Sequence, residues 1–450
     1  MAAKKYDMII VGAGPGGAAC GNIAAQIGLK PLILERAQVP GQKNHSGMAI
    51  FPGFMKEILG QDFPKNSPME DYEKFVMFVC ALGPKDSYSF YQNKDLTTFL
   101  WTVYRNEWDK WFAEQAVKSG ADLRTSVLVK NVIKNKGKVV GVVTDTGEEI
   151  FAPITVAADG TNSMLCRAAG LRPKYPRDCA LFVSHVFDFP EGFMDKKYGK
   201  DVRPGGYFMS AGFLDAEECG FGYLWCHSMH NQMVLGGGGF LQPGGVNAAV
   251  TPLNPNYTMQ KLLQHPKVQE WTDGGTWKYY CSHIDPAIAY LGCFGDTYMD
   301  GMMSIGDAGV GSGILGFGSM NATQTGKFAA ETAKRALEKG DVSAASLKEY
   351  QDTWKKEKWV VDAATEPYLY AKLATEDGLG PILNAMSDIY GKYIYNWYPG
   401  HGVMDGLGDL MRDFSQYGPN LFNMLPGLMP MFKSAVGPLA QMASLLGGEK

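Results

Sequence analysis

Gly12-Ala13-Gly14-Pro15-Gly16-Gly17 is the stretch that decides the fold of this chain. It follows a short apolar run, residues 6–11, and precedes a run of small residues typical of a closely packed helix. In such a strand–turn–helix unit Gly12 permits a tight turn and Gly14 lets a phosphate approach the backbone, while Gly17 lets helix and strand pack closely. The helix start then offers N–H groups to a pyrophosphate.

A second apolar strand, residues 31–35, follows the predicted helix and ends in Glu35, 21 residues after Gly14. A carboxylate at this distance accepts hydrogen bonds from ribose hydroxyls, and Arg36 lies beside it. Together these features predict a Rossmann-type α/β domain that binds a dinucleotide. The alternative is a glycine turn in an unrelated α/β protein.

Composition restricts the class of protein further. The chain has 450 residues, of which 46% are hydrophobic and 20% charged, as expected for a globular protein of two or three domains. A net charge of −4 without long runs of one sign argues against a nucleic-acid partner. The eight cysteines form no C-x-x-C pair and the histidines show no ligand spacing, so we expect no metal site. No signal peptide is evident, and we expect a reducing, cytoplasmic compartment.

Two further motifs specify the dinucleotide. Residues 157–163 contain Asp159-Gly160, and residues 304–309 contain Gly306-Asp307, followed by Gly316-Phe317-Gly318-Ser319-Met320-Asn321. In this order the three motifs resemble the glutathione-reductase-type FAD fold. They are similar to the branch shared by aromatic hydroxylases, geranylgeranyl reductases and electron-transfer-flavoprotein:quinone oxidoreductases. The resemblance covers roughly residues 1–355.

The resemblance implies roles for individual residues. Asp307 contacts the ribityl chain, and the helix start at 316–321 places N–H groups against the flavin N1–C2=O edge, where they stabilise negative charge. Arg105, in a segment similar to V-x-R-x-x-F-D-x-W, lies near FAD or else forms a surface salt bridge. Val127 lies along the adenine. The expected FAD-binding residues are Gly12, Gly14, Pro15, Gly17, Glu35, Arg36, Lys43, Ser46, Gly47, Arg105, Val127, Asp159, Gly160, Gly306, Asp307, Gly316, Gly318, Ser319, Met320 and Asn321.

The loop Gly41-Gln42-Lys43-Asn44-His45-Ser46-Gly47 discriminates between the families. Its Lys-Asn-x-x-Gly pattern resembles the quinone oxidoreductases and their FixC relatives. Sequences that resemble geranylgeranyl reductases have a Cys-Gly pair at this position, whereas this chain has Ser46-Gly47. We therefore expect Lys43, Asn44 and Ser46 at the flavin edge, with His45 as a proton donor near N5. The alternative is a polar loop that only covers the cofactor.

Residues 173–295 are rich in aromatics, glycines and short alternating runs, which predicts an inserted antiparallel-sheet domain for substrate or acceptor. Within it, Tyr223 and Trp225 faintly resemble part of a geranylgeranyl reductase signature. They are candidates for the wall of an apolar pocket, or else for packing within the sheet. The FAD-binding domain is expected to comprise residues 1–172 and 296–355.

The segment 356–450 differs from the rest of the chain. Residues 414–432 and 434–448 carry no charged side chain, and prolines interrupt both stretches. We expect a helical, apolar region that contacts a membrane surface or a partner subunit. It lacks the cysteine set of the iron–sulfur domain found in mitochondrial-type quinone oxidoreductases.

The resemblance implies an FAD-dependent oxidoreductase of FixC type, which passes electrons between an electron-transfer flavoprotein and a quinone. A separate ferredoxin-like protein and peripheral attachment to the inner face of the cell membrane are expected with it. One alternative is an FAD-dependent reductase of an apolar small molecule such as a prenyl lipid. Another is an assembly subunit in which FAD is only structural.

Overall fold

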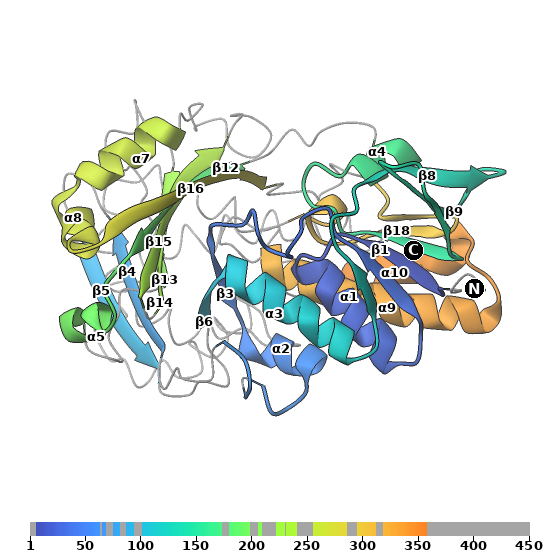
Figure 1. Ribbon diagram of the computed structural model, residues 1–450, viewed down its shortest axis with the longest axis horizontal. Helices are drawn as coiled ribbons and strands as arrows, with labels where there is room; N and C mark the ends of the chain where they lie inside the picture. The colour runs from blue at the N-terminus through green and yellow to red at the C-terminus, as the bar shows by residue number, and fades with distance from the viewer. Residues whose placement is uncertain are drawn as a thin grey trace, which may run out of the picture.

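Two main sheets organise the described part of the chain (Figure 1). The computed structural model describes residues 6–357 apart from 64, 69–74, 82–86, 94–100, 173–179, 199–205, 209–221, 230, 241–254, 286–294 and 312–317. One sheet has six mainly parallel strands and the other five antiparallel strands. The predicted region 356–450 lies outside the described residues except for its first two positions.

The six-stranded sheet contains the glycine turn. Its order is β17 (Tyr298–Met299), β18 (Met302–Ser304), β11 (Ile154–Ala157), β1 (Met8–Val11), β2 (Pro31–Leu34) and β7 (Asp122–Arg124). The central strand β1 pairs in parallel with both β11 and β2, and only β17 runs antiparallel to its neighbour. Because β1 and β2 are buried along their whole length, they are continuously apolar rather than alternating.

Helices cover one face of this sheet. Figure 1 shows α1, α3 and α9 side by side there. Their bounds, with those of two further helices nearby, are α1 (Pro15–Gln26), α2 (Pro52–Leu59), α3 (Arg105–Lys118), α9 (Gly318–Lys339) and α10 (Ala344–Trp354). Helices α1 and α9 touch at Gly16 and Gly326, where a Cβ on Gly326 would lie 2.4 Å from the Gly16 carbonyl oxygen. This close approach brings the start of α9 to the glycine turn.

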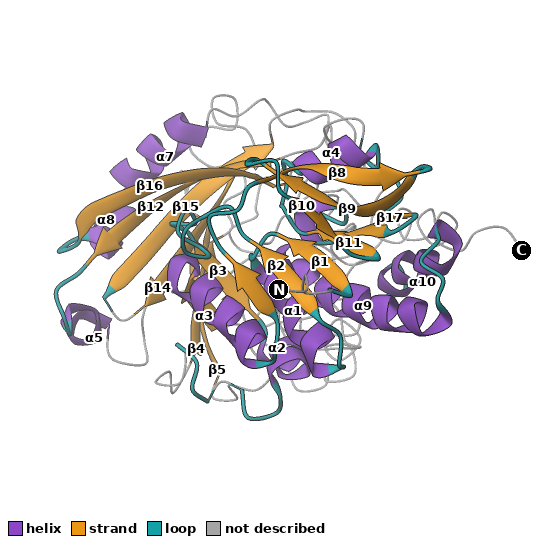
Figure 2. Ribbon diagram, turned by 45° about the vertical axis from the view of Figure 1, so that its right-hand side comes forward, coloured by secondary structure: helices purple, strands orange, loops and turns teal. Residues whose placement is uncertain are grey.

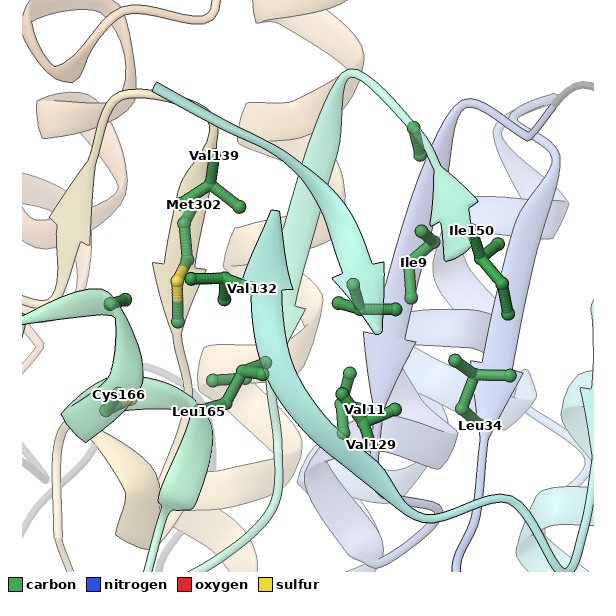
Figure 3. Close-up of a cluster of buried hydrophobic side chains, with 14 of the residues drawn as sticks. Ile9, Val11, Leu34, Val129, Val132, Val139, Ile150, Leu165, Cys166 and Met302 are labelled. Atoms are coloured by element: carbon green, nitrogen blue, oxygen red, sulfur yellow. The ribbon is translucent and has the colours of Figure 1, made fainter. Parts of the chain in front are cut away.

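A three-stranded antiparallel sheet covers the other face. It consists of β8 (Val129–Asn135), β9 (Lys138–Thr144) and β10 (Glu149–Phe151), with α4 (Met164–Ala169) beside it. Figure 3 shows the apolar core between the two layers, where Ile9 and Met302 meet Val132, Val139 and Leu165. This core fixes β1, β11 and β18, whose carboxyl ends carry the three predicted cofactor motifs.

The five-stranded sheet forms the second layer system (Figure 2). Its order is β13 (Gly206–Phe208), β14 (Gly222–Met229), β15 (Gln232–Phe240), β12 (Ala180–Asp188) and β16 (Thr276–Asp285). Two helices, α7 (Pro255–Gln264) and α8 (Pro266–Thr272), pack on one face around Leu235, Met259 and Trp271. The short helix α5 (Phe193–Tyr198) lies nearby, since Phe193 packs against the same core. The other face of β14 contacts β3 (Gly47–Ile50) and β6 (Trp101–Tyr104).

A hairpin from the N-terminal part of the chain joins this second system. Strands β4 (Phe75–Ala81) and β5 (Ser87–Asn93) pair with each other, and β4 lies beside β13. In sequence, residues 75–93 fall within the predicted FAD-binding domain, 1–172 and 296–355. A two-stranded hairpin is marginally stable alone, so packing beside another sheet gives it the support it needs.

Candidate functional site

The glycine turn between β1 and α1 combines tight packing with one open position. Gly12 has a φ of +109°, and a Cβ there would lie 2.3 Å from the Ala158 carbonyl oxygen. A Cβ on Gly17 would lie 1.9 Å from the Gly12 carbonyl oxygen. At Gly14, by contrast, the added Cβ would meet only Arg105 Nη2, at 4.0 Å. The turn therefore leaves space above Gly14 that is bordered by a guanidinium, which suits a phosphate group.

The start of α1 faces the same space. Gly14 is the N-cap and Pro15 the first helical residue, and no side chain caps the helix. No acidic side chain lies in its first turn. The N–H groups of the first turn and the positive end of the helix dipole therefore fit an anionic ligand. These groups fit the pyrophosphate of FAD.

Glu35 lies at the end of β2, where its carboxylate is held by the backbone. It accepts hydrogen bonds from the N–H of Ala13 and the N–H of Ala37, each at 2.8 Å. The Val127 N–H donates to the Glu35 carbonyl oxygen at 2.9 Å, so these two predicted residues lie together. Arg36, in contrast, is exposed. Each carboxylate oxygen keeps a second lone pair that can accept from a ribose hydroxyl.

Asp159 is buried after β11, and its carboxylate organises the start of α4. It accepts from Ser163 Oγ at 2.6 Å and from the Leu165 N–H at 3.1 Å. Burial raises the pKa of Asp159. Gly160 follows with a φ of +77° and no atom within 4 Å of an added Cβ. Within this motif, Asp159 shapes the turn and Gly160 presents an open backbone.

Thr161 connects this motif to two other regions, which the sequence did not predict. Its hydroxyl is placed to donate to the Ile284 carbonyl oxygen at 2.7 Å and to Asp307 Oδ2 at 3.4 Å. Arg172, also missed, is buried and donates from Nη1 to the Asp307 carbonyl oxygen at 3.4 Å. Asp307 thus lies where residues from three segments meet.

The turn after β18 is a short 3₁₀ helix, η2 (Gly306–Ala308). The Gly306 N–H donates to Thr325 Oγ1 of α9 at 3.0 Å, and Asn321 Nδ2 donates to the Gly311 carbonyl oxygen at 3.2 Å. These bonds attach the turn to the first half of α9. The predicted residues Gly318, Ser319, Met320 and Asn321 form the first turn of that helix, whereas Gly316 lies outside the described residues.

Residues 41–44 of the discriminating loop are attached to α3. Asn44 Nδ2 donates to Asp109 Oδ2 at 2.8 Å, and Arg105 Nη2 donates to the same oxygen at 2.7 Å. Asp109 is fully buried. Arg105 thus forms a salt bridge with a buried carboxylate and also borders the space above Gly14, while its role near FAD stays a prediction. Lys43 is exposed, and its carbonyl oxygen accepts from Cys281 Sγ at 3.7 Å.

Residues 45–47 of the loop instead contact the five-stranded sheet and its neighbour β6. His45 Nδ1 lies 2.7 Å from the Tyr104 hydroxyl, and its ring stacks on Tyr279. Ser46 is buried, donates to the Gly47 carbonyl oxygen at 3.1 Å, and lies 3.5 Å from Ser184 Oγ. The loop thus lies between the two parts of the molecule.

His227 of β14 closes the end of this loop. A Cβ on Gly47 would lie 2.0 Å from His227 Nδ1, so only glycine fits there without movement. Burial lowers the pKa of His227 from its ordinary value of 6.5 to about 3. The imidazole is therefore neutral at physiological pH. No sequence signal pointed to His227, Ser184 or Tyr279, because each lies far along the chain from the loop.

Trp225 lies two residues before His227 and is buried in the sheet. A Cβ on Gly236, its partner on β15, would lie 2.2 Å from Trp225 Cε2. Its ring also meets Phe182 edge-on at 5.2 Å. These contacts agree with the alternative that Trp225 packs within the sheet. The Tyr223 backbone pairs with Gly238, and a pocket role for Tyr223 and Trp225 stays a prediction.

Two other kinds of feature are absent from the described part of the chain. No group of three or more His, Cys, Asp or Glu side chains there is arranged to hold a metal ion. Nor is any described helix long and apolar enough to cross a membrane.

Comparison with known proteins places this architecture. No protein-family model matches the chain. The fold resembles a geranylgeranyl bacteriochlorophyll reductase-like protein from Thermoplasma acidophilum, with a TM-score of 0.66, 20% identity, and coverage of 94% of this chain and 99% of the other. It also resembles halogenase PltM, solved with phloroglucinol and FAD, with a TM-score of 0.62, 15% identity, and coverage of 98% and 94%. The predicted FAD-type Rossmann fold with an antiparallel-sheet domain is confirmed.

Sequence comparison gives the family. The chain is 31% identical to protein FixC of Azotobacter vinelandii over 363 residues, which cover 78% of this chain and 80% of that protein. It is 28% identical to protein FixC of Escherichia coli K12 over 358 residues, which cover 78% and 82%. The resemblance expected from the loop at 41–47 is therefore confirmed: this chain belongs to the FixC family.

Proposed function

We propose that this chain is an FAD-dependent oxidoreductase that passes electrons between an electron-transfer flavoprotein and a quinone. One observation carries the proposal. The space above Gly14 is bordered by the uncapped start of α1 and by Arg105, while Glu35 and Val127 meet nearby. These groups suit the pyrophosphate, ribose and adenine of FAD in turn. Membership of the FixC family supports the choice of reaction.

The remaining motifs are assigned to the other half of the cofactor. We assign Asp307 to the ribityl chain, and the assignment is supported by its two contacts: Thr161 Oγ1 at its carboxylate and Arg172 at its carbonyl oxygen. The first turn of α9 then directs its N–H groups toward the flavin N1–C2=O edge. The bound flavin supplies the redox chemistry, and the protein supplies orientation and burial.

The loop at 41–47 is assigned to the reacting face of the flavin. Asn44 is held by its hydrogen bond to Asp109, whereas His45 brings an imidazole that can donate or accept a proton. Ser46 is buried against the sheet, with its hydroxyl 3.5 Å from Ser184 Oγ. Lys43 is exposed and carries the positive charge at the rim of this loop.

Stopped-flow reduction of the purified holoprotein tests this function. We expect its FAD to exchange electrons with a cognate electron-transfer flavoprotein and with a soluble quinone analogue. Failure of both exchanges would contradict the proposal. Reoxidation by a prenyl-lipid substrate without any protein partner would instead favour an apolar-substrate reductase. Resistance to dithionite would indicate that FAD is only structural.

The expected partners form a separate part of the proposal. A ferredoxin-like protein would take the place of the iron–sulfur domain of the larger quinone oxidoreductases, and the apolar tail would attach the chain to a membrane surface. We expect the full chain to bind anionic liposomes and a chain truncated at residue 410 to bind them less. Equal failure of both chains to bind would contradict the membrane assignment.

A further inference from the structure

His45 is held between aromatic side chains from two distant parts of the chain. Its Nδ1 lies 2.7 Å from the hydroxyl of Tyr104 at the end of β6. Its ring lies 4.2 Å from the ring of Tyr279 on β16, with only 14° between the two planes. The hydrogen bond constrains rotation about the ring normal, and the stack constrains the ring plane. Two contacts of different kinds therefore determine one orientation of the imidazole.

Strand register explains why Tyr279 reaches His45. Tyr279 is opposite Val186 on β12, and Val186 packs with Tyr104 and Val234 on the sheet face that meets β6. The next residue, Tyr280, is opposite His185, and its hydroxyl donates to Asn256 Oδ1 of α7 at 2.8 Å. Because side chains alternate along a strand, Tyr279 and Tyr280 point to opposite faces of the sheet.

We propose that Tyr279 of the inserted sheet is a positioning residue for His45, and that with Tyr104 it selects the imidazole tautomer protonated on Nε2. The assignment rests on the proposed function only in that His45 then presents its Nε2–H to the flavin. Tyr279 itself acts through His45.

The chemistry of Tyr104 supports this tautomer. Burial raises the pKa of Tyr104 well above its ordinary value, with smaller contributions from Tyr279 and Asp188. The phenol therefore keeps its proton, and among the described residues the hydrogen-bond acceptor within reach of its O–H is His45 Nδ1. When it donates to Nδ1, a neutral imidazole carries its own proton on Nε2.

The neighbouring loop contacts explain why the stack is needed. Lys43 and Ser46, on either side of His45, are attached to Cys281 and Ser184 of the same sheet. These contacts fix the backbone of the loop but leave the His45 side chain free to rotate about its own bonds. Tyr104 and Tyr279 supply the remaining constraints on the imidazole, and of these two Tyr279 belongs to the five-stranded sheet.

The test compares four variants of the full-length holoprotein. Tyr279→Leu removes the ring, Tyr279→Phe keeps it, and Tyr104→Phe removes the hydroxyl. Tyr280→Leu is the matched control, since Tyr279 is 42% exposed and Tyr280 46% exposed on the same strand. Isotope-labelled histidine and long-range N–H correlation spectra report the tautomer of each ring, and His45→Gln assigns the His45 signals.

We expect wild type, Tyr279→Phe and Tyr280→Leu to show the Nε2–H tautomer at His45. In Tyr104→Phe and Tyr279→Leu we expect a mixture of tautomers. Flavin reoxidation should then slow by about tenfold, as for a misplaced proton-transfer group. The proposal is overturned if wild type shows the Nδ1–H tautomer, or if Tyr279→Leu keeps the wild-type spectrum. It is also overturned if Tyr280→Leu changes the His45 signals as much as Tyr279→Leu does.

The same spectra separate this proposal from the proposed function. The tautomer is measured also in chain stripped of FAD, where it depends only on Tyr104 and Tyr279. A chain that holds the Nε2–H tautomer but exchanges no electrons contradicts the function and supports the positioning role. A chain that exchanges electrons equally well in wild type and Tyr279→Leu, with unchanged spectra, contradicts the positioning role alone.

Discussion

The turn at 12–17 and the loop at 41–47 both depend on glycines, but different parts of the molecule enclose them. Gly12 and Gly17 are in close contact with backbone of the turn itself and of residue 158, within one sheet layer. Gly47 is enclosed by His227, which belongs to the other sheet. The close contacts of the turn therefore lie within one sheet layer, whereas the loop depends on the relative position of two sheets.

This difference indicates that the turn and the loop have different roles. We propose that the turn, built from local contacts, holds the pyrophosphate of the dinucleotide. The loop lies between two sheets, and we propose that the five-stranded sheet meets the substrate or partner. The contact of His45 with Tyr279 extends this dependence to the side chain proposed to exchange the proton. The following predictions test the contrast, from the largest expected effect to the smallest.

The largest effect is expected within the turn itself. Gly17→Ala should destabilise the protein by about 3 kcal/mol or more, because its Cβ would meet a carbonyl oxygen that cannot move aside. Gly14→Ala should change stability by less than about 1 kcal/mol, since its Cβ meets only Arg105 Nη2 at 4.0 Å. It should still weaken FAD binding by about tenfold. Denaturant titration and FAD titration of both variants measure these effects, and equal losses of stability would contradict the account.

Asp109 joins the two regions, since Arg105 and Asn44 both donate to it. Asp109→Ala should cost about 3 kcal/mol, the lower end for breaking a buried pair, because the Arg105 side chain is 26% exposed. Asp352→Ala, which breaks an exposed pair with Lys348 at the same i,i+4 spacing, should leave the free energy of unfolding nearly unchanged. Chemical denaturation gives both values. Similar costs for the two variants would argue against an anchoring role for Asp109.

His227 should make stability depend on pH below its ordinary pKa of 6.5. Because burial lowers its folded pKa to about 3, the unfolded chain binds the extra proton, and the folded state is destabilised as pH falls. Between pH 6.5 and about pH 5 this amounts to about 2 kcal/mol, at 1.36 kcal/mol for each pH unit. His227→Gln should lack this part of the pH dependence while the other titrating groups remain. If wild type and His227→Gln lose the same free energy of unfolding between the two pH values, the prediction is wrong.

Much of the fold could be predicted from sequence, because it follows from local patterns. The strand, glycine turn and helix lie within residues 8–26, and Asp307 lies directly after a buried strand. The inserted antiparallel sheet was also predicted from its composition. In contrast, nothing local assigned the hairpin at 75–93 to the second sheet.

The surroundings of the loop could not be predicted, for a physical reason. Ser46 and Ser184 are 138 positions apart, and Lys43 and Cys281 are 238 apart, so only the folded topology brings them together. For Trp225 the local sequence pattern was compatible with two different roles. Its residue type and strand spacing suited a pocket as well as packing, and only the absence of a side chain at Gly236 reveals the packing contact.

The smallest effect concerns the contact between loop and sheet. Gly47→Ala should displace the loop by pressing on His227, whose Nδ1 would lie 2.0 Å from the new Cβ. Shortening the opposing side chain should relieve this pressure, so Gly47→Ala in a His227→Ala background should be less harmful than in wild type. We expect a coupling free energy of about 1 kcal/mol in a double-mutant cycle. Strict additivity would show that the two residues do not meet.

Calorimetric titration with both ADP and FAD tests the central claim most directly. If the turn at 12–17 holds the pyrophosphate and the loop at 41–47 meets the flavin, Gly14→Ala should weaken both ligands by a similar factor. Asn44→Ala and Ser46→Ala should weaken FAD and leave ADP binding unchanged. Loop variants that weaken ADP as strongly as FAD, or a Gly14→Ala variant that binds ADP like wild type, would contradict the assignment of the two regions.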